Sequence, residues 1–469
     1  MVKDRTNTFR SLSVRNFRLF AAGQVVSVAG TWTMVVAQDW LVLGMTGDSG
    51  TALGVVTALQ FAPMLLLTLY GGRLADRYDK RMLLTAANLA AGALALVLAV
   101  LVLSGTVRLW HIWLLALGIG VVNAVEVPTR MSFVGELVGN DLLPNASGLS
   151  AAYFSVARVA GPALAGLLIT GFGTGWAIAV NAASYLATVA GLRMMRPEEN
   201  LGGVRGGGGE GEEEGGDGDP RRNARIIDGL RYTASRADLT LPMALVAVIG
   251  LFGMNFQLTL PLLAKTVFHA DATSFGLLTT AFAAGSLLGA IAGTRRSGRP
   301  AARTVIGAAL AFGVLETAAG WAPGFLGAVV LLTLTGFASI YFVQAANHRI
   351  QLGSDPRYRG RILALYTLIL QGSTPLGALL VGLLAEQLGA RAGLWLGGLV
   401  SLTAALAALG VEYRGSRGTA AGTDTGGGTR DSAPTRARVS DSTSAADSDS
   451  DSDSDERPVR DAAPEGRGR

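Results

Sequence analysis

Residues 72–81 read GRLADRYDKR, a charged segment between two apolar runs at 51–73 and 83–104. Each run has the ~20 residues that a helix needs to cross the hydrocarbon core of a bilayer. Basic residues between two spans mark a loop that stays on the cytoplasmic side. The stretch therefore predicts two membrane helices joined by a short cytoplasmic loop.

The same alternation continues along the chain, in which 50% of the residues are hydrophobic. Twelve spans fit this pattern without strain, although ten or fourteen stay open. They are predicted at 17–45, 51–73, 83–104, 109–132, 143–170, 174–194, 240–265, 273–294, 303–321, 325–348, 361–386 and 391–411. The fold class is thus an all-α membrane protein of twelve transmembrane helices in two pseudo-symmetric six-helix bundles.

Lysine and arginine gather in alternate loops, whereas the loops between hold only Arg108, Lys265 and Arg391. The basic side of a bacterial inner-membrane protein is cytoplasmic, so both termini are expected there. Gly- and Glu-rich residues and an Asp-Ser repeat cannot bury enough apolar surface to fold. The predicted parts are an amino-terminal segment (1–16), a first bundle (17–194), a flexible cytoplasmic linker (195–238), a second bundle (239–411) and a disordered tail (412–469).

Composition argues against several function classes. The chain has no cysteine, which excludes disulfides and thiol catalysis, and its three histidines fall in separate segments with no metal-ligand spacing. Its charges bracket apolar runs and form no basic face, so a net charge of +5 does not indicate nucleic-acid binding. We expect no catalytic residue, metal or cofactor, and a monomer in the lipid bilayer.

Residues 72–81 resemble the G-x-L-A-D-R-x-G-R-K loop of the major facilitator superfamily, with Asp79 in place of the usual glycine. Within that superfamily the chain resembles the drug and siderophore exporters of the enterobactin-exporter-like branch. The residues that carry this second resemblance are Arg15–Phe20, Phe61–Pro63, Pro128–Arg130 and Arg359–Arg361. The resemblance implies export of a hydrophobic or amphipathic small molecule (a drug, antibiotic or siderophore) by proton antiport with alternating access.

The resemblance also implies a conformational latch. In such families the motif's aspartate holds the two halves together in the outward-open state, which would bring Asp76 to the start of span eleven. Gly72 is expected to allow a close helix approach. The predicted latch residues are Gly72, Asp76, Arg77, Arg81, Arg130, Arg359 and Arg361.

Residues 161–166 read GPALAG and resemble the G-P-x-x-G-G element of antiporters. Proline removes a backbone donor and bends a helix, and small residues permit close packing. The resemblance implies that a bend at Gly161 and Pro162 seals a leak path, and Pro375 marks a similar bend in the second half. Ordinary small-residue packing is the alternative interpretation.

Ionisable groups inside a bilayer are costly, so each is a functional candidate. Asp39 and Glu126 are the candidates for proton coupling. Asp39 can instead reach the outer interface, and Glu126 can simply pair with Arg130 four residues later. Glu316 is predicted to be interfacial, near the outer end of its span. The predicted substrate-binding residues are Gln24, Gln38, Asn123, Arg158, Asn255 and Gln344.

Three other functions remain open from the sequence. An importer of the same fold has the same spans, and a lipid or lysolipid translocase suits an apolar cavity with one arginine. A membrane-embedded enzyme needs paired acids, a histidine cluster or a nucleophile with its base, and the sequence shows none of these.

Overall fold

The computed structural model describes residues 9–199, 231–234, 236–295, 298–355 and 358–424. In this part of the chain the regular structure is entirely helical, as expected. The main helices are α1 (Arg15–Thr46), α2 (Gly50–Arg77), α3 (Lys80–Leu103), α4 (Leu109–Phe172), α5 (Thr174–Met194), α7 (Ala237–Phe252), α8 (Phe256–Leu262), η3 (Leu263–Val267), α9 (Ala272–Thr294), α10 (Ala302–Gly320), α11 (Phe325–Gly353), α12 (Arg359–Leu388) and α13 (Ala392–Asp424).

Eleven helices in the described residues are long and apolar enough to cross a membrane. One of them, α4, has 64 residues and a non-helical backbone at Gly139 (φ 70°, ψ 173°). At ~1.5 Å per residue it would measure roughly 96 Å, three times the hydrocarbon thickness. Its two parts are therefore two spans, and the prediction of twelve transmembrane helices is confirmed.

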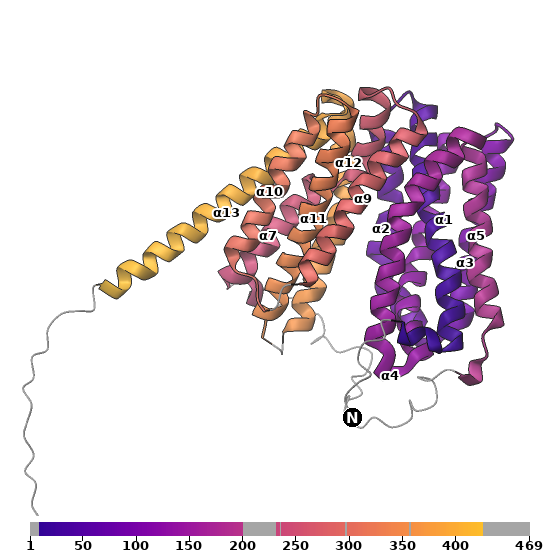
Figure 1. Ribbon diagram of the computed structural model, residues 1–469, viewed down its shortest axis with the longest axis horizontal. Helices are drawn as coiled ribbons and strands as arrows, with labels where there is room; N and C mark the ends of the chain where they lie inside the picture. The colour runs from indigo at the N-terminus through magenta and orange to yellow at the C-terminus, as the bar shows by residue number, and fades with distance from the viewer. Residues whose placement is uncertain (1–8, 200–230, 235, 296–297, 356–357, 425–469) are drawn as a thin grey trace, which may run out of the picture. The chain divides into compact units, whose positions relative to one another are not determined.

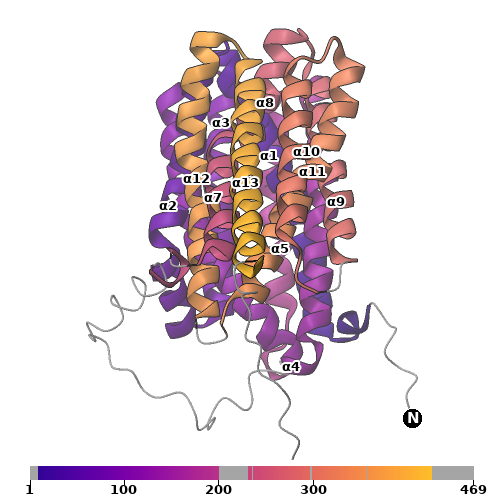
Figure 2. The ribbon, with the colours of Figure 1, turned by 90° about the vertical axis from the view of Figure 1, so that its left-hand side faces the viewer.

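Figure 1 shows α1–α5 on one side and α7–α12 on the other. Figure 2, turned by 90°, shows the helices of both groups running along a common direction. Among the described residues, those up to residue 416 form one compact unit, and those from residue 417 onward are separate from it. The linker between the bundles lies mostly outside the described residues, as does the tail from residue 425. Helix α13 continues to Asp424, so the first residues of the predicted tail are helical. The domain boundaries stay a prediction.

Short polar caps set where several helices begin. Ser49 Oγ accepts a hydrogen bond from Ala52 N (3.2 Å) at the start of α2. Asp79 accepts from Met82 N (2.7 Å) at the start of α3, and Asp271 accepts from Ser274 N (2.9 Å) at the start of α9. Asp79 has φ −57°, so the loop does not need the glycine usual at this position. The aspartate serves there as a helix N-cap.

The close approach in the charged loop motif falls one residue earlier than predicted. A Cβ added at Gly71 would clash with the backbone carbonyl of Ala124 on α4, whereas one at Gly72 would meet nothing within 4 Å. The prediction for Gly72 is therefore wrong. A glycine pair in a helix points to two faces, and only the face of Gly71 is covered.

The seventh span is discontinuous, which the sequence analysis did not predict. Helix α7 ends at Phe252, residues 253–255 are not helical, and α8 continues the span into a π-helical turn. The Asn255 side chain donates to Leu251 O (2.8 Å) and so satisfies one carbonyl that the break frees. Broken helices in transporters place backbone polar groups next to a binding site.

Candidate substrate cavity

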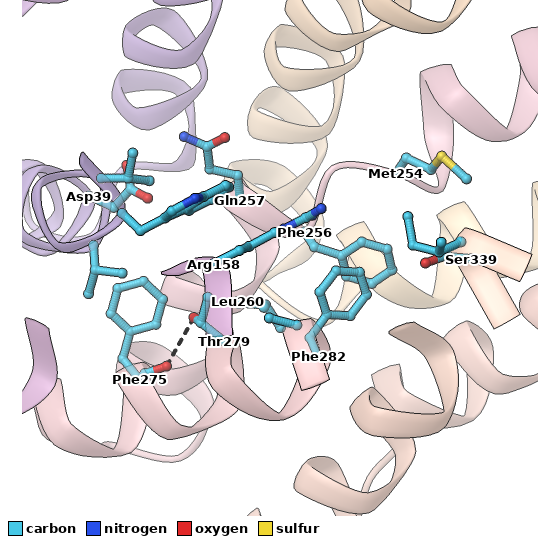
Figure 3. Close-up of a pocket in the computed structure, with 15 residues that line it drawn as sticks. Asp39, Arg158, Met254, Phe256, Gln257, Leu260, Phe275, Thr279, Phe282 and Ser339 are labelled. Carbon is cyan, nitrogen blue, oxygen red and sulfur yellow. Dashed lines mark hydrogen bonds between the residues drawn. The ribbon is translucent and has the colours of Figure 1, made fainter. Parts of the chain in front are cut away.

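A cavity of about 180 Å³ lies between the two bundles and is lined by α1, the second half of α4, the α7–α8 break, α8, α9 and α11. Its wall is largely aromatic and aliphatic, with two charged residues (Figure 3). The apolar lining includes Trp32, Met254, Phe256, Leu260, Phe275 and Phe282; the polar lining is Asp39, Arg158, Gln257, Thr279 and Ser339.

Asp39 and Arg158 are the two charged residues of the wall. Asp39 is 3% exposed and lines the cavity, so it does not reach the outer interface. In the described residues Asp39 has no hydrogen bond and no ion pair within 4.0 Å. Arg158 lies over the Trp32 ring, with Cζ 5.3 Å from the ring centroid. The carboxyl group of Asp39 and the guanidinium group of Arg158 are therefore both available to a ligand.

The GPALAG element brings this wall together. A Cβ at Gly161 would clash with Trp32 on α1, and Thr33 Oγ1 donates to Gly161 O (3.3 Å). On its other side, a Cβ at Gly166 would lie 2.8 Å from Thr273 Cα on α9. Arg158 is one turn before Gly161, so this packing holds its guanidinium against Trp32. The packing interpretation therefore describes the geometry, and the leak-sealing role stays a prediction.

The other bend, at Pro375 in α12, also lies in a tightly packed region. Two residues later, a Cβ at Gly377 would clash with the backbone carbonyl of Leu251 at the end of α7. Small residues beside both prolines thus allow close approach to an adjacent helix.

The remaining predicted substrate-binding residues do not line the cavity. Gln24 and Gln38 are buried at 3% and 4% exposure, and Asn255 faces the end of α7. Gln344 lies against Gly293 of α9, and Asn123 is half-buried on α4. The sequence places these polar side chains within membrane spans, but it does not show which neighbouring helix covers each of them.

Glu126 and Arg130 form the predicted ion pair on α4. Arg130 Nε lies 2.9 Å from Glu126 Oε1, and the two side chains are 17–18% exposed. The pair is not part of the cavity wall. Mutual neutralisation is what this geometry shows, and an exchange of partners on protonation stays a prediction.

The predicted latch residues are dispersed in this structure. Asp76 is exposed and has no hydrogen bond or ion pair in the described residues. Arg81 donates to Leu192 O (2.7 Å) at the end of α5, and Arg359 donates to Gln351 O (3.1 Å). Arg361 lies over Tyr358, and Arg77 lies over the ring of the residue that follows it. Asp76 is thus not joined to the start of α12.

Polar contacts join the bundles at the opposite end, where the loops hold few cations. Lys265 Nζ lies 2.6 Å from Asp48 Oδ1 and 5.6 Å from the centroid of Trp40. The Trp40 ring in turn stacks on the Phe275 ring, with the two ring centroids 5.9 Å apart. The sequence analysis missed this connection, although Lys265 was one of three cations on that side.

A second connection at this end involves Glu386 of α12. Its Oε2 accepts hydrogen bonds from Ser49 Oγ (3.1 Å) and Thr51 N (3.1 Å) at the start of α2. A carboxylate at a helix N-terminus is favoured by the helix dipole. The second bundle therefore supplies an anion to the first amide groups of a helix in the first bundle.

Glu316 is buried, so the prediction of an interfacial residue is wrong. It is 1% exposed, and its Oε2 has no hydrogen-bond partner. A Cβ at Gly253 would lie 3.0 Å from Oε2, and one at Gly397 would lie 2.9 Å from Oε1. Gly253, in the break after α7, and Gly397, on α13, therefore make room for the carboxyl group. The position of Glu316 within its own helix does not reveal this.

Comparison with known proteins agrees with this architecture. The family described as transmembrane secretion effector matches residues 6–421. The multidrug efflux pump Tap of Mycolicibacterium fortuitum is 25% identical over 393 residues, which cover 80% of this chain and 90% of that protein. Macrolide efflux protein A of Streptococcus pyogenes is 22% identical over 377 residues, covering 78% and 89%.

The fold is also found among solved structures. A bacterial homolog of the human lysosomal transporter Spinster, in an inward-facing and unoccupied conformation, matches with a TM-score of 0.65 at 14% identity. The match covers 86% of this chain and 97% of that chain. A likeness at this identity shows the fold alone.

Proposed function

Because this chain belongs to the transmembrane secretion effector family of the major facilitator superfamily, we propose that it exports a hydrophobic or amphipathic small molecule from the cytoplasm. It is a multi-pass membrane transporter and not an enzyme. The observation that carries the export proposal is the aromatic cavity between the bundles, whose wall holds Asp39 and Arg158. Within the described residues, neither side chain forms an ion pair.

The wall chemistry supports the proposed substrate class. Aromatic rings contribute apolar contact area, while Asp39 and Arg158 offer one group for a cationic and one for an anionic substituent. Drug-sized ligands occupy roughly 300–1,000 Å³, so the cavity of about 180 Å³ must widen to hold one. The names of the two relatives, which point to multidrug and macrolide efflux, support the same class.

The distribution of inter-bundle contacts supports alternating access. The cation-rich loops favour cytoplasmic termini, so the end joined through Lys265 and Glu386 faces outward. The structure then corresponds to a state closed to the outside. In the opposite state we expect that end to separate and Asp76 to approach Arg359 and Arg361.

Asp39 is the proposed proton carrier. A buried carboxyl group without a fixed cationic partner exchanges its proton readily with a change in surroundings. Proton entry from outside would neutralise Asp39 and release a substrate held by its charge. Return to the inward state then delivers the proton to the cytoplasm. Glu126 has a cationic partner four residues away, which makes it the weaker candidate.

Transport in inverted membrane vesicles tests this proposal. With an imposed proton gradient, the wild type should concentrate a macrolide or a lipophilic cationic dye, and collapse of the gradient should abolish accumulation. The Asp39→Asn variant should lose gradient-driven accumulation, because its neutral side chain neither carries a proton nor holds a substrate by charge. Asp141→Asn, which removes an exposed carboxylate of α4, is the matched control.

Accumulation that persists in the Asp39→Asn, Glu126→Gln double variant would contradict proton coupling through these groups. Two rival functions appear as outcomes of the same system. Substrate movement only in the reverse direction would indicate an importer. Movement of a fluorescent lysolipid between leaflets, without any drug transport, would indicate a lipid translocase.

A further inference from the structure

The C-terminal bundle contains a buried carboxyl group that the exporter mechanism above does not use. Glu316 is 1% exposed on α10, and in the described residues it has no hydrogen bond and no ion pair within 4.0 Å. An isolated ionised carboxylate in such surroundings is very costly, so the group either carries a proton or acquires a partner. The uncharged form is the one that this site accommodates.

The charged neighbours of Glu316 are distant along their helices. Arg391, which precedes α13, donates to Gly320 O (3.2 Å), about one turn beyond Glu316. No group on a packed helix forms a hydrogen bond or ion pair with Glu316 in the described residues. The titratable and charged groups of the helices around Glu316 are Asp238 on α7, Arg303 on α10, Tyr341, His348 and Arg349 on α11, and Glu412, Tyr413, Arg414, Arg417 and Asp424 on α13.

The carboxyl group faces the break between α7 and α8. Phe252 is the last residue of α7, and its carbonyl accepts no hydrogen bond in the described residues. The position of a Cβ at Gly397 would lie 2.6 Å from Phe252 O and 2.9 Å from Glu316 Oε1. Phe252 O and Glu316 Oε1 therefore both border the same small space beside Gly397. Two acceptors at such a place repel each other unless one of them carries a hydrogen.

The same break forms part of the cavity wall on its other side. Met254, within the break, and Gln257, in the first turn of α8, both line the cavity. Gly253, whose Cβ position would lie 3.0 Å from Glu316 Oε2, is followed directly in the chain by Met254. A change in the charge of Glu316 therefore acts directly on the segment that shapes the cavity.

We propose that Glu316 is a second proton-binding site of this transporter, which holds the α7–α8 break in the observed geometry when it is protonated. The carboxyl group, with its proton on Oε1, donates to Phe252 O and satisfies the carbonyl that the break leaves open. On deprotonation, the proton passes to water that enters from the cavity past Met254. The carboxylate then repels the Phe252 carbonyl, and the break rearranges.

Infrared spectroscopy of the full chain in liposomes tests proton binding directly. At neutral pH, the wild type should show the carbonyl stretch of a protonated carboxylic acid, and Glu316→Gln should remove it. Glu412→Gln should leave that signal in place, because Glu412 lies by a cation, with its Oε1 3.8 Å from Arg303 Nε. A protonated-acid signal unchanged by Glu316→Gln would overturn the proposal.

A spin label tests the link to the cavity. The chain has no cysteine, so Met254→Cys provides a single attachment site without further changes. Label mobility should rise with pH in the wild-type background, and it should stay low and independent of pH with Glu316→Gln, which mimics the protonated acid. A pH response of equal size in that variant would refute the coupling.

Two further variants complete this test. Glu316→Asp withdraws the carboxyl group from Phe252 O by one methylene, so the mobile state should appear at lower pH than in the wild type. Asp39→Asn should leave the label response intact even if it abolishes transport. The two proton sites can thus fail independently, and failure of the exporter proposal does not decide this one.

Discussion

Replacing Lys265 or Asp48 tests whether the contact at the end opposite Asp76 holds the bundles together. Lys265→Met removes the ion pair with Asp48 and the cation above Trp40 but keeps an apolar stem of similar length. Asp48→Asn removes only the ion pair. Asp48 has φ +68°, a left-handed conformation that asparagine also tolerates, so the loop geometry is retained.

The size of the effect follows from exposure. The two side chains are 24% and 34% exposed, so solvent screens the pair and limits it to about 1 kcal/mol. A cation over a tryptophan ring adds about 0.5–1 kcal/mol at a partly exposed site. Lys265→Met should therefore change the ratio of outward-closed to outward-open protein by roughly 5- to 30-fold. Asp48→Asn should change it by roughly 2- to 5-fold.

Distance measurements between two spin labels report this ratio. Cysteines introduced on the α1–α2 loop and on the loop before α9 should show a larger fraction of long distances in both variants. Lys265→Arg, which keeps the charge, is the control. The double variant should be no more open than Lys265→Met alone, because both remove the same pair. Unchanged distances, or fully additive effects, would refute the reasoning.

Gly71→Ala should destabilise the protein by about 1–3 kcal/mol through its clash with Ala124. Gly72→Ala should be neutral or stabilising by up to ~1 kcal/mol. Equal effects of the two variants on thermal unfolding in detergent would contradict the conclusion that Gly71 makes the close approach. Asp76→Asn should lower the labelling of an outward-facing cysteine if the latch forms in the outward-open state, and unchanged labelling argues against it. Backbone and side-chain hydrogen bonds from Ser274 lower the pKa of Asp271 in the folded protein. As a helix cap, the Asp271 carboxylate stabilises the fold by about 1 kcal/mol. This stabilisation is fully present above the unfolded-state pKa of ~3.9 and is lost as the pH falls through the lower folded-state pKa. Asp271→Ala should accordingly lower the melting temperature at neutral pH, and a loss that persists undiminished at strongly acidic pH would contradict this assignment.

Much of the fold could be predicted because a bilayer forces each span to satisfy its own backbone. Runs of ~20 apolar residues and the basic loops between them sufficed for twelve spans, including the two that merge in α4. The break in the seventh span escaped prediction, since Gly253 is one of many glycines in apolar runs. Its effect depends on Asn255 and on neighbours supplied by α10 and α13.

The candidate site was predicted only in part. Asp39 and Arg158 were identified because a charge inside a bilayer is costly wherever it points. Uncharged glutamine and asparagine side chains cost less to bury in a bilayer, so their presence in a span does not single them out. Most of those predicted to bind substrate pack against neighbouring helices instead. Glu316 was misplaced because its depth was judged from sequence position alone, whereas the space that accepts it is made by Gly253 and Gly397.

The sequence by itself determined the number of spans, their order and the asymmetry of the charged loops, since these depend on local hydropathy and on charge near each span. Only the tertiary structure decided that Asp39 and Arg158 share a cavity, that Lys265 joins the bundles, and that Glu316 lies behind the broken helix. These relations arise from packing between helices distant in the chain, where one glycine determines which faces can meet.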